Sequence, residues 1–305
     1  MKKIKIVVIT GPTASGKSAL AALLSRLFNG EIISADSMQV YRYMDVGTAK
    51  PPEEDRRAVP HHLIDVADPR EDYTAERFRK EAADKIREIR GRGKNVFVAG
   101  GTGLYIKALL FGIFEGPEAD ISLRDELLRE AELNGAEALF ERLKEADPVA
   151  ASKTHPNNLR RVIRALEVYS LTKRPISEFQ QEHGFREAGY DALKIGLVRE
   201  RAALYRDIEN RVDRMMEEGL LDETRALIER GFNMRLKPMR GLGYKEMADC
   251  LNGELSLDEA VALLKKNTRR YAKRQMTWFR KDNGIAWFSP EEKEDIVSLV
   301  KRHLS

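Results

Sequence analysis

The chain has 305 residues, of which 33% are charged and 42% are hydrophobic. This balance is typical of a folded globular protein and excludes a disordered one. Charged residues interrupt every apolar stretch before it reaches the about 18 to 20 residues that a bilayer span needs, so we expect no membrane segment and no membrane partner. The single cysteine, Cys250, excludes an internal disulfide and a zinc site built on paired thiolates, and it favours a cytoplasmic protein.

The overall charge does not identify a partner, because 53 Lys and Arg against 49 Asp and Glu leave a formal net charge of only +4. The distribution of charge is more informative. Between Val261 and Ile285, eight basic residues stand against one acid, Asp282. A local positive excess of this kind suits a polyanionic partner.

The first elements of the chain read as strand, turn and helix. Residues 4–10 form a β-branched apolar run, a glycine-rich turn follows, and leucines at helical spacing continue to Leu27. Further strands are expected at residues 31–35, 62–66, 95–99 and 193–198. Helix-length segments such as residues 75–91 separate them. Strands that alternate with helices predict a parallel sheet of the α/β class.

Residues 116–189 have a different pattern, with charged amphipathic helices and no strand signal. Because a strand is expected again at 193–198, we interpret this stretch as an insertion between two parts of one core. The predicted domains are an α/β core at 1–115 and 190–305 and a helical insertion domain at 116–189. The C-terminal part is expected to be mostly helical, with a last short strand at 285–288.

Residues 11–18 fit the pattern G-x-x-x-x-G-K-[ST] at every fixed position, and they lie between a predicted strand and a predicted helix, as this phosphate-binding motif requires. Its backbone amides curl around phosphate oxygens, Lys17 adds a cation, and Ser18 can ligate Mg²⁺. The residues expected to bind phosphate are Gly11, Pro12, Thr13, Ala14, Ser15, Gly16, Lys17 and Ser18. The predicted fold is therefore a P-loop NTPase-like parallel sheet with a helical insertion domain.

Many P-loop proteins place a magnesium-binding Asp at the end of a second apolar strand. Here the strand at 95–99 ends in Gly100, Gly101 and Thr102 instead. Asp65 could supply a carboxylate, although an Asp at a strand end is as often a cap or turn residue. The missing carboxylate weakens the ATPase interpretation without eliminating it.

Motifs along the rest of the chain resemble the tRNA dimethylallyltransferase family, also called the tRNA isopentenyltransferases. They are found at residues 34–41, 45–51, 100–105, 155–158, 160–161, 164–167, 241–244 and 273–278. The resemblance runs nearly from end to end. Eukaryotic members commonly have a C-terminal zinc finger, and because we expect none here, this chain resembles the bacterial members. It implies transfer of a dimethylallyl group from its pyrophosphate to the exocyclic amine of the adenine just 3′ of the anticodon. In that family the loop holds the pyrophosphate of the donor, with Mg²⁺, and not ATP.

The amine of adenine attacks poorly because its lone pair is delocalised into the ring, so a general base must help. The resemblance assigns this role to Asp36, at the C-terminal edge of the predicted sheet. From the residues alone, Asp36 could equally cap the following turn. Thr13 and Thr102 match family positions near the reacting groups, with turn hydrogen bonding as the alternative. Arg211 matches an arginine near the pyrophosphate, with a solvated helix face paired to Asp207 as the alternative.

The target adenine has to be turned out of the anticodon loop to reach a buried electrophile. The resemblance implies RNA contacts from Asp36, Ser37, Met38, Gln39, Thr102, Arg124, Arg160, Arg161, Arg164, Arg240, Gly241, Leu242, Gly243, Tyr244 and Lys245. The basic stretch 265–281 could also hold phosphates while its aromatic rings pack inward. For Trp278 we favour a place in a core stripe.

Three functions are compatible with the residues. The first is a prenyl transferase of tRNA, and the second is a small-molecule or nucleotide kinase in which Asp36 activates a hydroxyl. The third is a GTPase-like RNA-binding module, for which no guanine-selecting motif stands out. Prenyltransferases of free adenine nucleotides share the loop, but the insertion and the basic C-terminal region favour a macromolecular acceptor. We expect a monomer whose partners are a tRNA anticodon stem-loop and dimethylallyl pyrophosphate.

Overall fold

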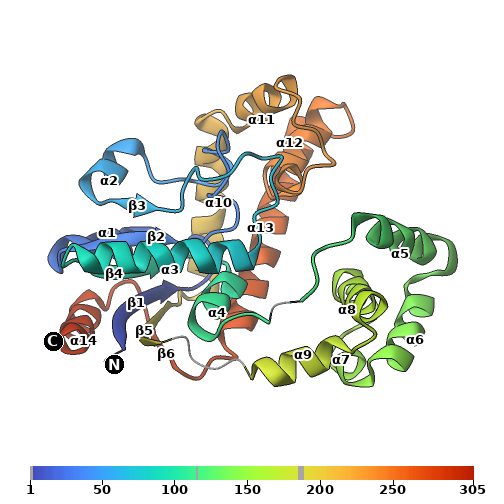
Figure 1. Cartoon of the computed structure of the whole chain (residues 1–305). Helices are drawn as coiled ribbons and strands as arrows, with labels where there is room; N and C mark the ends of the chain where they lie inside the picture. The colour runs from blue at the N-terminus through green and yellow to red at the C-terminus, as the bar shows by residue number, and fades with distance from the viewer. Residues whose placement is uncertain (1–2, 115, 185–188) are drawn as a thin grey trace. The chain divides into compact units, whose positions relative to one another are not determined.

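The structure is a computed structural model that describes residues 3–114, 116–184 and 189–305. The chain divides into two compact units (Figure 1). One unit comprises Met1–Leu110 and Ala188–Ser305, and the other comprises Phe111–Glu187. The corresponding boundaries predicted from the sequence are 115/116 and 189/190.

The first unit is built on a six-stranded sheet with the order β3-β2-β4-β1-β5-β6, in which every pair of neighbours is parallel. The strands are β1 Ile4–Thr10, β2 Gly30–Ser34, β3 His61–His62, β4 Asn95–Ala99, β5 Tyr190–Leu197 and β6 Ile285–Phe288. The continuous buried run from Ile6 to Ile9 in β1 is what a strand covered on both faces requires. The predicted parallel α/β core is confirmed.

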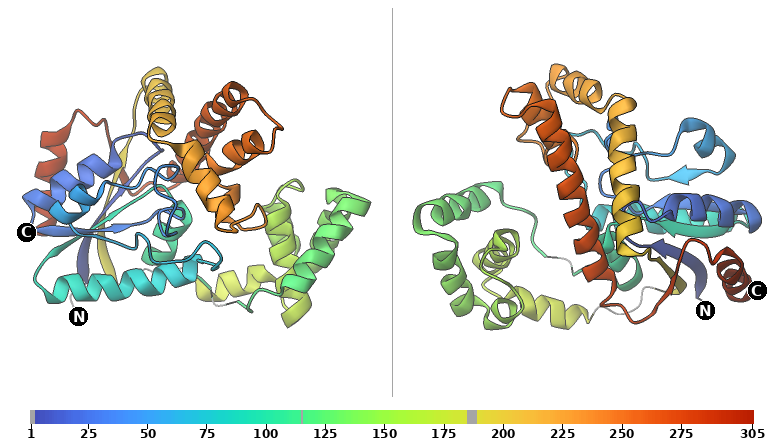
Figure 2. Two further views of the ribbon diagram at one scale, coloured as in Figure 1. Left: turned by 90° about the horizontal axis from the view of Figure 1, so that it is seen from above. Right: turned by 180° about the vertical axis from the view of Figure 1, so that it is seen from behind.

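Helices cover both faces of this sheet. Helices α1 (Lys17–Leu27) and α14 (Lys293–Leu304) pack against Val7 and Ile9. Helix α3 (Ala75–Gly91) lies against β2 and β4 on the side opposite to α1, as the left view of Figure 2 shows. The other helices of this unit are α2 Glu53–Ala58, α4 Gly103–Phe111, α10 Arg201–Glu217, α11 Leu220–Glu229, the 3₁₀ turn η1 Pro238–Arg240, α12 Tyr244–Leu251 and α13 Leu257–Phe279.

Helix α13 is the longest of the described helices, with 23 residues, and it lies beside α10 (Figure 1). It begins at a capping box in which Ser256 Oγ accepts from the Glu259 N–H while Glu259 accepts from the Ser256 N–H. Its buried positions recur every three or four residues and comprise Ala260, Leu264, Thr268, Ala272, Gln275 and Phe279. The buried stripe of α13 therefore includes one long polar side chain, Gln275.

All of the regular secondary structure among the described residues of the second unit is helical. Its helices are α5 Ile121–Asn134, α6 Ala136–Ala146, α7 Pro148–Ser152, α8 Leu159–Thr172 and α9 Ile176–His183. They enclose a core with Leu139, Leu143 and Val162 at its centre. The buried carboxylate of Asp147 accepts from the Ala150 N–H at 2.8 Å, which caps α7, and it also accepts from the backbone and hydroxyl of Ser177.

The strand predicted at residues 62–66 is wrong, because β3 ends at His62. Leu63 and Asp65 have φ angles of 62° and 59°, a left-handed conformation that no strand accommodates. Leu63 and Ile64 still fill the core from this loop, which explains the apolar pattern. Among the described residues, no helix has both the length and the apolar character that crossing a bilayer requires.

Candidate active site

The predicted catalytic and donor-binding residues come together at one edge of the sheet. The P-loop, defined as residues 11–18, follows β1, Asp36 follows β2, and Gly100 to Thr102 follow β4. These three strands are neighbours in the sheet and run parallel, so their C-terminal ends meet at the same edge. Ligands of open α/β sheets bind at this edge.

The P-loop has the backbone of an anion-binding nest. Gly11 and Gly16 have φ angles of 139° and 92°, and a Cβ on Gly11 would lie 2.5 Å from the carbonyl oxygen of Leu197. Helix α1 begins at Lys17, so its free N–H groups point toward the loop. The hydroxyl of Ser15 is buried without a hydrogen-bond partner among the described residues. A buried hydroxyl and helix amides that lack partners are suited to phosphate oxygens.

The ammonium group of Lys17 lies inside this loop and donates a hydrogen bond to the carbonyl oxygen of Pro12 at 2.5 Å. Burial and, to a smaller extent, the positive charge of Arg211 lower the pKa of Lys17 to about 7, although the carboxylate of Asp36 partly opposes both. Lys17, Arg211 and Asp36 therefore lie within electrostatic reach of one another. The two cations repel each other, so an anion placed between them would relieve the repulsion.

Arg211 projects from α10 into this group. Burial lowers its pKa, whereas Asp36 raises it and Arg214 lowers it. The alternative of a solvated arginine paired with Asp207 is wrong, since Asp207 lies 3.3 Å from Arg199 instead. A desolvated guanidinium beside the P-loop is a strong donor for a polyphosphate.

Asp36 caps a turn, as the residues alone allowed. Its Oδ1 accepts hydrogen bonds from the N–H groups of Met38 at 2.9 Å and Gln39 at 3.4 Å. Its second oxygen, Oδ2, has no hydrogen-bond partner among the described residues. The capping bond fixes the carboxyl group, and Oδ2 stays available to accept a proton, so capping and base catalysis are compatible.

The residues that follow β4 approach the Asp36 turn closely. The hydroxyl of Thr102 accepts from the Ser37 N–H at 3.0 Å, and the Thr102 N–H donates to the carbonyl oxygen of Ala35 at 3.2 Å. A Cβ on Gly100 would lie 2.1 Å from that same carbonyl oxygen, so only glycine fits there. Thr102 thus holds the backbone beside Asp36.

Gln275 is a site residue that was not predicted individually from the sequence, although it lies in the family motif at 273–278. Its side-chain amide joins the P-loop at Thr13 to the loop after β4 at Gly101. One turn earlier on α13, Tyr271 has a pKa raised by burial and next by the charge of Asp36. The core position expected for Trp278 is wrong, because its side chain is 38% exposed, although its ring packs where Gly103 lacks a Cβ.

A second group of contacts organises the segment after Asp36. The carboxylate of Glu223 on α11 accepts from the N–H groups of Asp45, Val46 and Gly47 at 2.8 to 3.0 Å and from the hydroxyl of Tyr244 at 2.8 Å. We call this group the Glu223 clamp. It ties residues 45–47, part of one family motif, to the start of α12, which belongs to one of the predicted RNA-binding segments.

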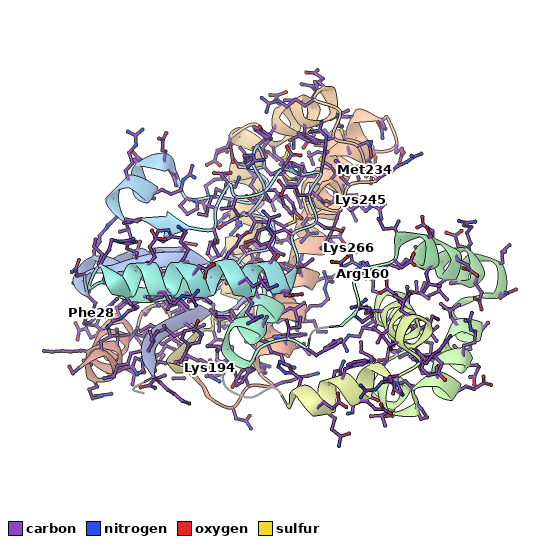
Figure 3. All side chains as sticks on the ribbon, in the orientation of Figure 1. Phe28, Arg160, Lys194, Met234, Lys245 and Lys266 are labelled. Atoms are coloured by element: carbon purple, nitrogen blue, oxygen red, sulfur yellow. The ribbon has the colours of Figure 1, made fainter. Side chains whose placement is uncertain are left out.

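The side chains of the predicted RNA-binding residues in this unit differ in accessibility. Tyr244 is fully buried, at 0% exposure. The side-chain amide of Gln39 accepts a hydrogen bond from the Ser34 hydroxyl and donates to the carbonyl oxygens of Thr48 and Ala49. These two side chains therefore organise the protein interior. Met38 packs against Gly241. Arg240, the last residue of η1, and Lys245, in the first turn of α12, are both exposed, and Figure 3 labels Lys245.

The predicted RNA-binding arginines of the second unit fall into two classes. Arg124 and Arg164 pair with Glu167, whose carboxylate is 0% exposed, at distances of 2.6 to 3.0 Å. Arg160 and Arg161 are exposed at the start of α8, and Figure 3 labels Arg160. Arg124 and Arg164 are therefore engaged with Glu167, whereas Arg160 and Arg161 are exposed and are not paired with that carboxylate.

Asp65 is not available as a magnesium ligand. Its Oδ1 accepts from Lys50 at 2.5 Å and its Oδ2 from Arg56 at 2.9 Å. In the described part of the chain, no three His, Cys, Asp or Glu side chains are grouped so as to hold a metal. Ser18 is exposed in the first turn of α1. Its hydroxyl fits a Mg²⁺ ion held mainly by phosphate oxygens, which is the usual mode for this ion.

A cavity of about 250 Å³ lies beside the P-loop, between α10 and α13. Its lining combines apolar and basic side chains. They are Pro12, Val198, Arg199, Arg201, Leu204, Tyr205, Ala272, Lys273, Met276, Thr277 and Arg280. Such a lining suits a small ligand that has an apolar part and a negative charge.

The parallel sheet, the phosphate nest and the cations around it define a P-loop protein of the α/β class. The model of the IPP transferase family matches residues 39–282 of the chain. The tRNA dimethylallyltransferase 2 of Geotalea uraniireducens is 55% identical over 98% of this chain and 96% of its own length. The tRNA dimethylallyltransferase of Geobacter metallireducens is 52% identical over 98% and 97%.

Solved structures are similar over 90% or more of this chain. The crystal structure of a tRNA isopentenylpyrophosphate transferase from Bacillus halodurans is 44% identical, with a TM-score of 0.73 over 99% of this chain and 97% of that one. A eukaryotic dimethylallyltransferase acting on tRNA is 33% identical, with a TM-score of 0.77 over 90% of this chain and 70% of that one. The chain belongs to the IPP transferase family.

Proposed function

We propose that this chain is a tRNA dimethylallyltransferase. It transfers the dimethylallyl group of dimethylallyl pyrophosphate to the exocyclic amine of the adenine just 3′ of the anticodon and releases pyrophosphate. The observation that carries the proposal is the grouping of Lys17, Arg211 and Asp36 around the P-loop, where two cations face a carboxylate that keeps one free oxygen. The names of relatives up to 55% identical support the same reaction.

The donor is held by its diphosphate. The amides of the P-loop and the hydroxyl of Ser15 donate hydrogen bonds to the phosphate oxygens. The positive charges of Lys17 and Arg211 balance the negative charge of the diphosphate. The cavity beside Pro12 supports an amphiphilic donor, because Arg199, Arg201 and Lys273 share its lining with apolar side chains. An isoprenoid diphosphate has this combination of a charged end and an apolar end.

The reaction breaks the bond between the allylic carbon and the diphosphate oxygen, and the electron pair leaves with pyrophosphate. Negative charge therefore grows on the oxygen that the P-loop holds. The positions of Lys17 and Arg211 favour this charge more strongly in the transition state than in the ground state. Mg²⁺, held by Ser18 and the donor's phosphate oxygens, would add positive charge at the same place.

The new bond joins the allylic carbon to the exocyclic nitrogen of adenine, which loses a proton as it attacks. Oδ2 of Asp36 accepts that proton, because Oδ1 is occupied by the Met38 N–H and the carboxyl group is held in one orientation. Thr102 keeps the backbone next to Asp36 in place through the Ser37 N–H. Proton acceptor and leaving group thus lie on different loops of one sheet edge.

The acceptor is a tRNA whose target base is turned out of the anticodon loop. In the first unit, Arg240 and Lys245 and the basic face of α13 offer exposed positive charge to the RNA backbone, and Figure 3 labels Lys266 on that helix. In the second unit, Arg160 and Arg161 do the same. These contacts would make RNA binding depend on salt concentration.

A transfer assay tests the proposal against a P-loop kinase. The protein is incubated with labelled dimethylallyl pyrophosphate and an anticodon stem-loop RNA, and in parallel with labelled ATP and the same RNA. We expect label on the RNA only with the isoprenoid donor, and only when the stem-loop carries adenine 3′ of the anticodon. Phosphate transfer from ATP without prenyl transfer would overturn the proposal.

A further inference from the structure

We propose that Gln275 is a positioning residue that sets the distance between the donor-holding P-loop and the acceptor-side loop after β4. It belongs to α13, far in sequence from both loops, and it does not itself contact the reacting atoms. This inference rests on the proposed function, since it assigns the residue that aligns the two substrates of that reaction.

The amide of Gln275 makes one hydrogen bond to each loop. Its Oε1 accepts from the backbone N–H of Thr13 at 2.8 Å, and its Nε2 donates to the carbonyl oxygen of Gly101 at 3.0 Å. The partners lie 262 and 174 residues away along the chain. A side chain that both accepts and donates at this reach is a glutamine, because a carboxylate cannot donate and asparagine is one carbon shorter.

Burial makes these two bonds specific. Gln275 is 6% exposed, so water cannot easily replace either partner. A Cβ on Gly101 would lie 2.2 Å from Nε2 of Gln275, which means that the loop approaches the amide more closely than any other residue type permits. One turn earlier on the same helix, Tyr271 lies within the electrostatic reach of Asp36 and Arg211, so this face of α13 borders the reaction centre.

Gln275 links a continuous series of contacts from the donor to the base. Thr13 lies in the P-loop, Gly101 precedes Thr102, and the hydroxyl of Thr102 holds the N–H of Ser37, next to Asp36. A shift of either loop therefore changes the separation between the leaving group and the proton acceptor. Misplacement of reacting groups by about 1 Å can cost on the order of 100-fold in rate.

Two substitutions at this position separate its two bonds. Gln275→Glu keeps an acceptor for the Thr13 N–H and removes the donor to Gly101, whereas Gln275→Met removes both bonds at similar volume. We expect kcat to fall about 10-fold or more in Gln275→Glu and further in Gln275→Met, with donor KM and RNA KM within about 3-fold of the wild-type values. Gln181→Glu, at an exposed position of α9, is the control for the same chemical change and should retain wild-type kcat.

The readouts distinguish positioning from a general loss of structure. The thermal midpoint and the calorimetric affinity for dimethylallyl pyrophosphate are measured for each variant, to show that it folds and binds the donor. The kcat of the folded variants then tests the positioning role. If Gln275→Met does not fold, Gln275→Glu provides the same test. A kcat within about 3-fold of wild type in a folded variant, or a rise in KM at unchanged kcat, would overturn the inference. Failure of the wild-type protein to prenylate RNA would instead overturn the proposed function.

Discussion

The hydroxyl of Thr102 accepts a hydrogen bond from the backbone N–H of Ser37 at 3.0 Å, which joins the C-terminal ends of β4 and β2 beside Asp36. The isosteric change Thr102→Val leaves that N–H without its partner and removes a hydrogen bond that contributes about 1 kcal/mol of free energy. We expect kcat to fall about 5- to 10-fold in Thr102→Val, while Thr102→Ser retains most of it. Steady-state prenyl transfer measures both. Equal activity of the valine variant would mean that the bond has no influence on the base.

Asp36 supports two roles that one pair of variants separates. Asparagine retains an oxygen that can cap the turn at Met38 but removes the basic carboxylate, and alanine removes both. We expect Asp36→Asn and Asp36→Ala each to lower the single-turnover rate roughly 100-fold or more, with RNA affinity largely retained. Near-normal turnover of the asparagine variant would show that the residue acts only as a cap.

The pKa of Lys17, about 7 in the free protein against an ordinary 10.5, makes donor binding depend on pH. A diphosphate favours the charged ammonium and raises its pKa, so binding above pH 7 takes up a proton. We expect calorimetry of pyrophosphate binding at about pH 8, in two buffers of different ionisation enthalpy, to detect this uptake. The uptake should be absent in Lys17→Arg, which stays charged, and its persistence there would assign the proton to another group.

The same shift predicts a pH dependence of stability. Between about pH 7 and 10.5 the unfolded chain binds more protons at Lys17 than the folded protein does, so the contribution of this residue to the free energy of unfolding rises with pH in that range. The free energy of unfolding, measured with denaturant, should therefore rise more steeply with pH in this range for the wild type than for Lys17→Met. Parallel pH profiles would contradict the lowered pKa.

The two classes of arginine in the second unit predict different phenotypes. Arg160→Ala should weaken stem-loop binding and reduce its salt dependence by about one phosphate contact, without changing the thermal midpoint. Arg124→Ala removes a partner of the buried Glu167 carboxylate and should destabilise the unit by about 1 to 3 kcal/mol. Binding isotherms at several salt concentrations and thermal unfolding measure the two effects. Equal destabilisation by Arg160→Ala and Arg124→Ala would contradict the division into exposed arginines and arginines that pair with Glu167.

The Glu223 clamp predicts a positioning effect on RNA binding. Glu223→Gln places an amide nitrogen among three backbone N–H donors and should loosen residues 45–47. We expect the KM for RNA to rise about 10-fold with an unchanged affinity for the donor, and Tyr244→Phe should have a smaller effect. The exposed Glu229→Gln at the end of α11 is the control. A selective loss of donor affinity would contradict this assignment.

Elements with strong local patterns were predictable from the sequence. The apolar run of β1, the amphipathic helix at 75–91 and the last strand at 285–288 have the bounds that the structure gives them. The P-loop was recognisable because its geometry requires particular residue types at fixed spacing. The strand prediction at 62–66 was wrong because an apolar run indicates burial and not strand structure. Leu63 and Ile64 are buried, but they lie in a loop that contains left-handed residues.

The contacts that organise the site had no local signal. Gln275 binds Thr13 across 262 residues, and Glu223 binds Asp45 across 178, so no periodicity along the chain links them. Arg211 has the spacing of an ordinary amphipathic helix, so the family resemblance and the fold, and not the local pattern, place it beside Lys17 and Asp36. The chemistry of a loop was readable from its residues, whereas the distances between loops depend on the complete fold.

The central claim is that the P-loop presents a prenyl diphosphate to an adenine of RNA. The most direct test is to digest the RNA product of a reaction with unlabelled dimethylallyl pyrophosphate to nucleosides and to locate the added group by mass spectrometry. We expect a five-carbon unit on the exocyclic nitrogen of the adenine 3′ of the anticodon, and roughly 100-fold less of it with the Asp36→Asn protein at equal time. Unmodified RNA from the wild-type protein, despite saturating donor, would contradict it.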